Sequence, residues 1–321
     1  MVFIGHQNQW DFLKRVVEND KVPQALIFAG VEGLGKKLVA LEFAKLLSCE
    51  AKQKAQRDPC HECYSCLTIE QNTFPDVFLI EPKNKEIQIE QIRELQNKVG
   101  LRPHLAERKV VIVDQAEALN QQAANCFLKT LEEPRGDVIF ILITSQPERL
   151  LATIRSRCSI LKFYPVPQEQ IIKHLAKDVS PETLREVWPL AGGRVGMLLN
   201  LLEKKNYSVF HQTIKEIRDC LDGSLTDNFL FIKKLLASEN NSSLAISFLD
   251  HFILYLRNLL IAKLGLTDGG IVSGFSFKKE HSLSKISQMI KEAERMRAIL
   301  ISTNVSPRLI LENLFINVLS N

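Results

Sequence analysis

The sequence lacks the features that mark an exported chain or a membrane protein. Its first residues have no basic start, apolar centre or small-residue cleavage site, so they do not read as a signal peptide. The longest apolar stretch, residues 244–265, could cross a bilayer by length, but Asp250, Arg257 and Lys263 interrupt it. We expect a cytoplasmic protein with no membrane partner, in which this stretch is a buried or bundled helix.

The chain also lacks a large charge surplus, internal repeats and low-complexity segments. Its 41 Lys and Arg residues against 37 Asp and Glu residues give a net charge of +4, which does not diagnose nucleic-acid binding without a clustered basic face. Its 321 residues, 45% of them hydrophobic, are enough to bury a core in each of two or three domains. Composition therefore leaves the partner open.

Short apolar runs alternate with helical periodicity up to about residue 165. The runs are apolar almost throughout, as is typical of parallel strands that are covered on both faces. We predict an α/β domain with a parallel five-stranded sheet, whose strands cover residues 25–29, 76–81, 110–114, 138–144 and 160–164.

Amphipathic helices replace the strand signals after the Pro165-Val166-Pro167 break. A glycine pair at 192–193 and a polar stretch at 203–206 separate a small helical unit from a larger C-terminal bundle. The predicted helices cover residues 168–177, 181–190, 195–203, 207–221, 227–238, 242–265, 281–301 and 306–319.

A phosphate-binding loop of the Walker A type follows the first predicted strand. Gly30, Gly33 and Gly35 allow backbone N–H groups to wrap a phosphate, and Lys36 would reach its outer oxygens from the start of a helix. The alternative is a tight strand-to-helix turn without a ligand. The spacing favours a phosphate site.

Two positions argue against hydrolysis at this loop. Lys37 stands where active enzymes place the Ser or Thr that holds Mg²⁺, and an ammonium group repels a cation. Asp114 ends a predicted strand where a second metal-holding carboxylate belongs, but Gln115 follows it in place of a glutamate base. Glu117 is expected to be an exposed residue that opens a helix. Binding of ATP or ADP is left open.

Four of the seven cysteines form a C-x10-C-x2-C-x2-C pattern at Cys49, Cys60, Cys63 and Cys66. Four thiolates close a tetrahedral shell, which predicts one structural zinc ion; His61 would be a fifth donor and is left out. An iron–sulfur cluster is the alternative, and disulfides are disfavoured in the cytoplasm. A third reading, an independent nucleic-acid binder, is disfavoured because the linker between Cys49 and Cys60 has little aromatic content and no dense basic stripe.

Longer motifs carry a family resemblance. The segments 3–7 (FIGHQ), 22–36 (VPQALIFAGVEGLGK), 125–134 (NCFLKTLEEP) and 153–158 (TIRSRC) resemble, in order and spacing, those of bacterial clamp-loader subunits of the AAA+ class. Together they cover about the first 165 residues. The missing metal ligand and base are typical of a branch that does not hydrolyse ATP, rather than of the tau/gamma subunits that do. A lid sensor arginine is also replaced, by Gly196, although Arg194 is near.

The resemblance implies the organisation and partners of the chain. It implies a RecA-like AAA+ domain at 1–166 with a zinc module at 49–66, a helical lid at 167–206 and a helical collar at 207–321 that holds subunits together. It also implies a five-subunit ring with delta and tau/gamma subunits of DNA polymerase III, which loads a sliding clamp onto primed DNA during replication.

Arg157 of the TIRSRC motif is intact. By resemblance it is an arginine finger that acts in trans on the nucleotide bound by a neighbouring subunit, where its charge stabilises phosphoryl transfer. The alternative for this residue is a surface arginine in a salt bridge near the last strand. The alternative for the whole chain is an ATP-hydrolysing clamp-loader-like AAA+ ATPase.

Overall fold

The structure is a computed structural model. The predicted helix at 181–190 lies largely outside the part of the chain that it describes, and Pro134 lies outside it too. The described residues are 3–51, 58–83, 85–133, 136–175, 179–180, 183–184, 187–188, 191–237, 241–265, 282–303 and 305–319.

Two compact units make up the chain. The first unit combines Met1–Leu175 with the short segment Gly193–Met197, and the second combines Ala176–Gly192 with Leu198–Asn321. The segment Gly193–Met197 therefore returns to the first unit after the chain has left it. The division into three domains stays a prediction.

A five-stranded parallel sheet with the order β2-β3-β4-β1-β5 forms the centre of the first unit. Each strand starts and ends within two residues of its predicted range, so the predicted sheet is confirmed. The strands are β1 (Ala25–Ala29), β2 (Val77–Ile80), β3 (Lys109–Val113), β4 (Val138–Thr144) and β5 (Ser159–Lys162).

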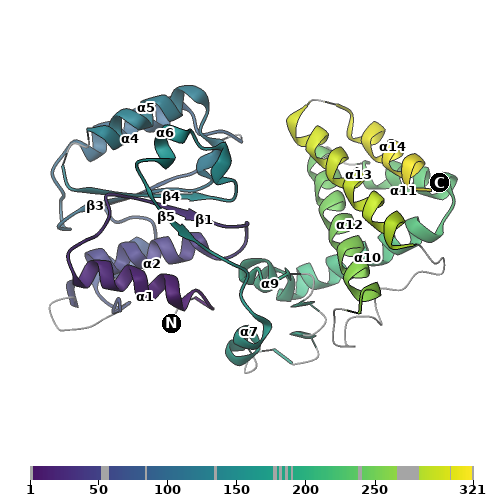
Figure 1. The fold of residues 1–321 in the computed structure, drawn as a ribbon, viewed down its shortest axis with the longest axis horizontal. Helices are drawn as coiled ribbons and strands as arrows, with labels where there is room; N and C mark the ends of the chain where they lie inside the picture. The colour runs from purple at the N-terminus through teal and green to yellow at the C-terminus, as the bar shows by residue number, and fades with distance from the viewer. Residues whose placement is uncertain are drawn as a thin grey trace. The chain divides into compact units, whose positions relative to one another are not determined.

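Helices cover both faces of this sheet, as Figure 1 shows. On one face, α1 (Gln7–Glu18) and α2 (Lys36–Ser48) pack on alternate strand residues such as Phe28. On the other, α4 (Ile89–Val99) and α5 (Gln121–Glu132) pack on the residues between, such as Phe140. Burial on both faces explains why the strands are apolar throughout.

Short elements complete the first unit. They are α3 (Tyr64–Glu70), the 3₁₀ turns η2 (Ala116–Ala118) and η3 (Pro147–Arg149), α6 (Ala152–Arg155) and α7 (Gln168–Leu175). The helix α9 (Val195–Leu202) begins in the first unit and ends in the second.

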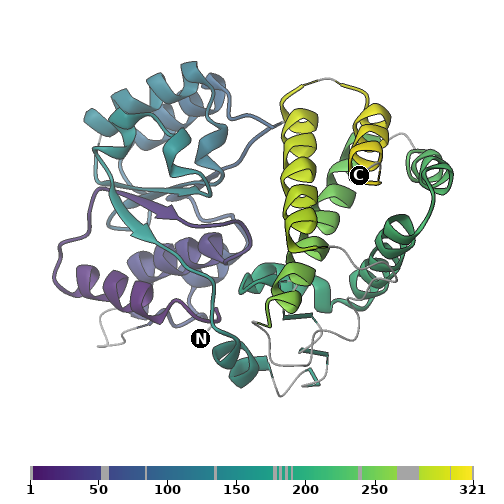
Figure 2. The ribbon, with the colours of Figure 1, turned by 45° about the vertical axis from the view of Figure 1, so that its right-hand side comes forward.

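The second unit is a helical bundle (Figure 1, Figure 2). Its central helix α12 is long and apolar enough to cross a membrane, but it packs against α10, α11, α13 and α14. Within this bundle, Phe248 and Phe252 contact Phe315. The predicted buried helix is confirmed. The helices are α10 (Lys204–Asp222), α11 (Leu225–Leu235), α12 (Asn241–Lys263), α13 (Leu283–Ser302) and α14 (Pro307–Leu319).

Candidate functional site

The phosphate loop joins the end of β1 to the start of α2, as the sequence predicts. Gly33 and Gly35 have φ angles of 81° and 89°, in the left-handed region that favours glycine. Gly35 is the N-cap of α2, and a Cβ there would meet no atom within 4 Å. The loop therefore presents the first turn of α2 on an open side.

Lys36 is buried inside this loop. Its Nζ donates to the carbonyl oxygens of Gly30 and, at 2.7 Å, of Val31. Burial lowers the pKa of Lys36, and the carboxylates of Glu117 and Asp114 oppose that shift. The lysine thus connects the start of α2 to the beginning of the loop through two backbone carbonyl oxygens.

Lys37 lies beside two carboxylates that follow neighbouring strands. Its Nζ forms an ion pair with Glu81 Oε1 and lies 3.8 Å from Asp114 Oδ2. Burial raises the pKa of Asp114, whereas the charge of Lys37 opposes that rise. Because this ammonium is paired with the two carboxylates and repels a second cation, the residues present do not fit a bound magnesium ion.

Glu81 was not singled out from the sequence. Parallel pairing sets Ile80 beside Val113, so the next residues, Glu81 and Asp114, leave the sheet side by side. Carboxyl ends of neighbouring parallel strands are where ligand sites form in such sheets. The proximity of Glu81 and Asp114 therefore follows from the strand register, which the sequence alone does not give.

The prediction for Glu117 was wrong. This residue lies in the turn η2, half-buried, and its Oε1 accepts from the backbone N–H and the hydroxyl of Ser145, at 3.0 and 2.6 Å. Burial raises the pKa of Glu117, but hydrogen bonds from Ser145, from the Thr144 side chain and from its own backbone together hold that pKa below its ordinary value. The following helix begins only at Gln121, because the Asn120 side chain caps it by accepting from Ala123 N.

The first turn of α9 lies on the phosphate loop. Gly196 N donates to Gly33 O at 2.7 Å, and a Cβ on Gly196 would sit only 3.0 Å from that oxygen. The position aligned with a sensor arginine therefore needs glycine for this close approach. The side chain of Arg194 also lies at Gly33, with its Cβ 3.5 Å from where a Cβ on Gly33 would stand.

Arg157 lies just beyond α6, half-exposed. Its Nη2 is 2.7 Å from Glu132 Oε1, and its Nη1 donates to Thr153 O at 3.0 Å. The salt bridge weighed as the alternative reading is therefore present in this chain. It does not exclude a role in trans, because the guanidinium remains accessible to solvent.

The four cysteines come together, as predicted. All four Sγ atoms lie within 4.8 Å of one another, with Cys49 and Cys60 3.6 Å apart and Cys60 and Cys66 4.0 Å apart. These separations are too long for a disulfide and bracket the roughly 3.8 Å between sulfurs of a tetrahedral zinc site. Hydrogen bonds from the backbone of Glu62 and Cys63 lower the pKa of Cys60 to about 7. The cluster could hold a metal ion.

His61 points elsewhere. Its Nε2 lies 3.5 Å from Glu42 Oε2 on α2, and Glu42 forms a buried ion pair with Lys45 at 2.8 Å. His61 is therefore not among the residues that gather at the sulfur cluster. The sequence analysis did not single out this buried ion pair on α2.

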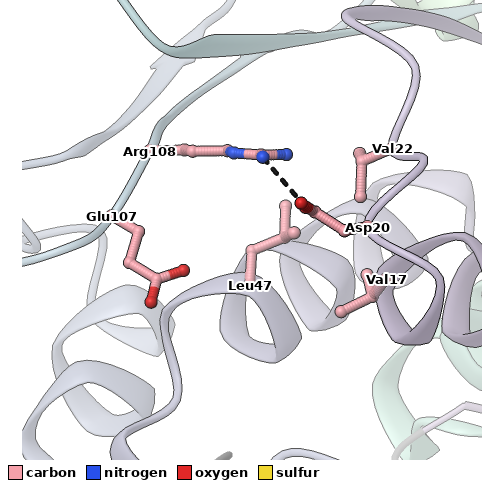
Figure 3. Close-up of a pocket in the computed structure, with 6 residues that line it drawn as sticks. All are labelled: Val17, Asp20, Val22, Leu47, Glu107 and Arg108. Atoms are coloured by element: carbon pink, nitrogen blue, oxygen red, sulfur yellow. Dashed lines mark hydrogen bonds and ion pairs between the residues drawn. The ribbon is translucent and has the colours of Figure 1, made fainter.

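A small cavity of about 20 Å³ lies near the end of α1, lined by residues shown in Figure 3. The Arg108 Nη2 atom contacts Asp20 Oδ1 at 3.0 Å across it. Such a volume holds about one water molecule and no nucleotide. None of the predicted site residues lines it.

Comparisons with known proteins agree with these motifs. A family model described as DNA polymerase III, delta subunit, matches residues 5–167. The delta' subunit of Bacillus subtilis DNA polymerase III is 31% identical over 283 residues, 85% of this chain and 83% of the relative. The delta' subunit of Pseudomonas aeruginosa is 39% identical over 175 residues, 53% of this chain and 52% of the relative.

Among solved structures, a DNA polymerase III gamma subunit-related protein from Thermotoga maritima aligns with a TM-score of 0.59. The alignment covers 97% of this chain and 98% of that chain at 21% sequence identity. At this identity the likeness concerns the fold alone. The predicted AAA+-like α/β fold with a helical C-terminal region is confirmed.

Proposed function

The chain belongs to the delta prime family of DNA polymerase III clamp-loader subunits, and we propose that it contributes to ATP hydrolysis only at a neighbour's site. It lends Arg157 as an arginine finger in trans and hydrolyses no ATP itself. The observation that carries this proposal is the ion pairing of Lys37 with Glu81 and Asp114.

Lys37 blocks the chain's own site by charge. Phosphoryl transfer in P-loop proteins needs Mg²⁺ held by the loop hydroxyl and a strand-end aspartate. In this chain the ammonium of Lys37 stands in place of the loop hydroxyl and lies beside the strand-end Asp114, so a divalent cation would have to displace it from two carboxylates. Gln115 adds a second defect, because an amide cannot accept the proton of an attacking water.

Arg157 supports a role at another subunit's site. Its guanidinium is planar, permanently charged and suited to phosphate oxygens, and its side chain is 40% exposed. An exposed arginine of this kind reaches a nucleotide only if a neighbouring subunit brings one to it. Other arginine fingers accelerate hydrolysis roughly 10³- to 10⁵-fold.

The proposed partners follow from the family. We propose that the chain assembles in the cytoplasm with delta and tau/gamma subunits in a five-subunit ring that acts on a sliding clamp and primed DNA. The helical unit is proposed as the collar that holds this ring. The four cysteines are proposed to bind one zinc ion with no open position, which makes the site structural.

The test is ATP turnover by the assembled complex that contains Arg157→Ala. The variant is expected to abolish hydrolysis at the neighbouring subunit's site, so that the remaining turnover comes from the other ATPase sites of the complex. Arg149→Ala is the matched control, because Arg149 is an exposed arginine whose side chain bonds only Gln146 among the described contacts. Equal turnover by wild type and Arg157→Ala would overturn the finger proposal.

A further inference from the structure

Arg157 contacts three acceptors, the Glu132 carboxylate, the Thr153 carbonyl oxygen and the Ser156 hydroxyl. Nη2 is paired with the Glu132 carboxylate, and Nη1 donates to Thr153 O and, at 3.4 Å, to the Ser156 hydroxyl. Glu132 is the last residue of α5, and Thr153 is the second of the four residues of α6. The C-terminus of α5 carries partial negative charge, which adds to the attraction of the Glu132 carboxylate for the guanidinium.

This arrangement competes with the role in trans. A finger must offer its terminal N–H groups to phosphate oxygens, and both terminal nitrogens of Arg157 are engaged within the chain. The Glu132 carboxylate also neutralises the charge that the transition state would use. Departure from Glu132 would release this charge and the paired Nη2 N–H for a neighbour's nucleotide.

The pair is weak enough to open. The side chains of Arg157 and Glu132 are 40% and 46% exposed, so water screens their attraction. Ion pairs of such exposure change equilibria by up to about fivefold, which corresponds to about 1 kcal/mol. A phosphate group that carries more charge, in a site shielded from water, attracts the guanidinium more strongly.

We propose that Glu132 is a latch that holds Arg157 against its own subunit until a neighbour's nucleotide takes the arginine over. This inference rests on the proposed role of Arg157 as the finger. It assigns to Glu132 a restraining effect on hydrolysis, whereas a residue that only aims the finger would promote hydrolysis. The two roles predict changes of opposite sign when the carboxylate is removed.

The test is a double-mutant cycle in the reconstituted complex with delta and tau/gamma subunits. ATP turnover without clamp or DNA is measured for wild type, Glu132→Gln, Arg157→Ala and the double variant. Glu132→Gln is expected to raise turnover, by up to about fivefold, and to have no effect in the Arg157→Ala background. The absence of an effect in the Arg157→Ala background would show that Glu132 acts through Arg157 and is not simply needed for folding.

Two further variants sharpen the result. Glu133→Gln removes the adjacent exposed carboxylate and is expected to leave turnover unchanged. Glu132→Asp keeps the charge on a shorter side chain and is expected to fall between wild type and Glu132→Gln; it also serves if the glutamine variant fails to assemble.

The outcomes separate this inference from the proposed function. If Arg157→Ala leaves turnover unchanged, the finger proposal fails and the latch fails with it. If Arg157→Ala lowers turnover but Glu132→Gln lowers it or leaves it unchanged, the finger stands and the latch is overturned. An equal rise in both arginine backgrounds also overturns the latch.

Discussion

At the scale of residues, tertiary contacts in the first unit are predicted to make its stability depend on pH and its nucleotide binding depend on Mg²⁺. His6 is buried, and its Nε2–H donates to Leu34 O of the phosphate loop at 2.8 Å. Burial lowers the pKa of His6 from its ordinary value of 6.5, and the nearby charge of Lys36 lowers it further, although the bond to Leu34 opposes both. The folded state therefore favours the neutral imidazole.

The stability of the first unit is predicted to fall at acidic pH because of His6. Below about pH 6.5 the unfolded chain binds a proton that the folded chain resists, so the free energy of unfolding falls with decreasing pH, with a limiting slope of about 1.4 kcal/mol per pH unit. Urea unfolding of wild type and His6→Gln is compared at pH 7.5 and 5.5.

Trp10 fluorescence in a Trp188→Phe background confines the signal to the first unit, since Trp10 lies in the core around α1. Wild type is expected to lose more stability than His6→Gln between the two pH values. Parallel losses in the two proteins would show that His6 does not titrate on unfolding.

Lys37 is predicted to exclude magnesium from the nucleotide site. Lys37→Thr removes the ammonium from Glu81 and Asp114 and supplies a hydroxyl, so it is expected to strengthen Mg²⁺-dependent binding of ATP by at least about tenfold, or about 1.4 kcal/mol. A fluorescent ATP analogue, titrated with and without Mg²⁺, measures the change.

Lys21→Thr is the control, because Lys21 is an exposed lysine that precedes β1, whereas the loop follows the other end of that strand. It is expected to bind like wild type. Wild-type binding of the magnesium nucleotide as tight as that of Lys37→Thr would show that the ammonium does not obstruct the site. Hydrolysis is expected to stay absent in the variant because Gln115 is unchanged.

At the scale of elements, the sequence predicts most of the secondary structure but misplaces the starts of α5 and of α10, which begins at Lys204 rather than at 207. The strand ranges follow from apolar runs because the sheet is covered on both faces. The helix ranges follow from amphipathic periodicity because each helix is buried on one face. The error at Glu117 arose because helical periodicity continues through η2, whereas the Asn120 cap sets the true start. The asparagine was the available signal.

The cysteine-bearing segment around α3 is predicted to depend on one zinc ion. Cys49 follows α2, while Cys63 and Cys66 belong to the start of α3, so a shared ion would tie the two helices together. Elemental analysis is expected to give one zinc per chain and to show its loss in Cys63→Ser. Proteolysis within residues 50–70 is expected to accelerate in that variant.

Cys126→Ser tests whether the effect belongs to the cluster. Cys126 is a free cysteine outside the group of four, and its Sγ lies 3.6 Å from Gln96. Its replacement is expected to leave the zinc content unchanged. Iron in place of zinc, or full metal content in Cys63→Ser, would contradict the zinc site.

At the scale of the whole molecule, the site could be predicted in its residue types but not in its contacts. Motif spacing identified the phosphate loop, Asp114, Arg157 and the cysteines. The partners Glu81 and Glu132 come from strand register and from the meeting of two helix ends, which depend on tertiary packing. The contact between Gly196 and Gly33 likewise joins segments far apart in the chain.

The central claim is that this chain's own nucleotide site is closed to hydrolysis and that its contribution is made at a neighbour's site. ATP turnover by the purified chain alone, in the presence of Mg²⁺, tests it most directly, with wild type and Lys36→Ala side by side. We predict no turnover above background for either protein. Turnover by wild type that Lys36→Ala abolishes would contradict the account and identify the chain as an ATPase in its own right.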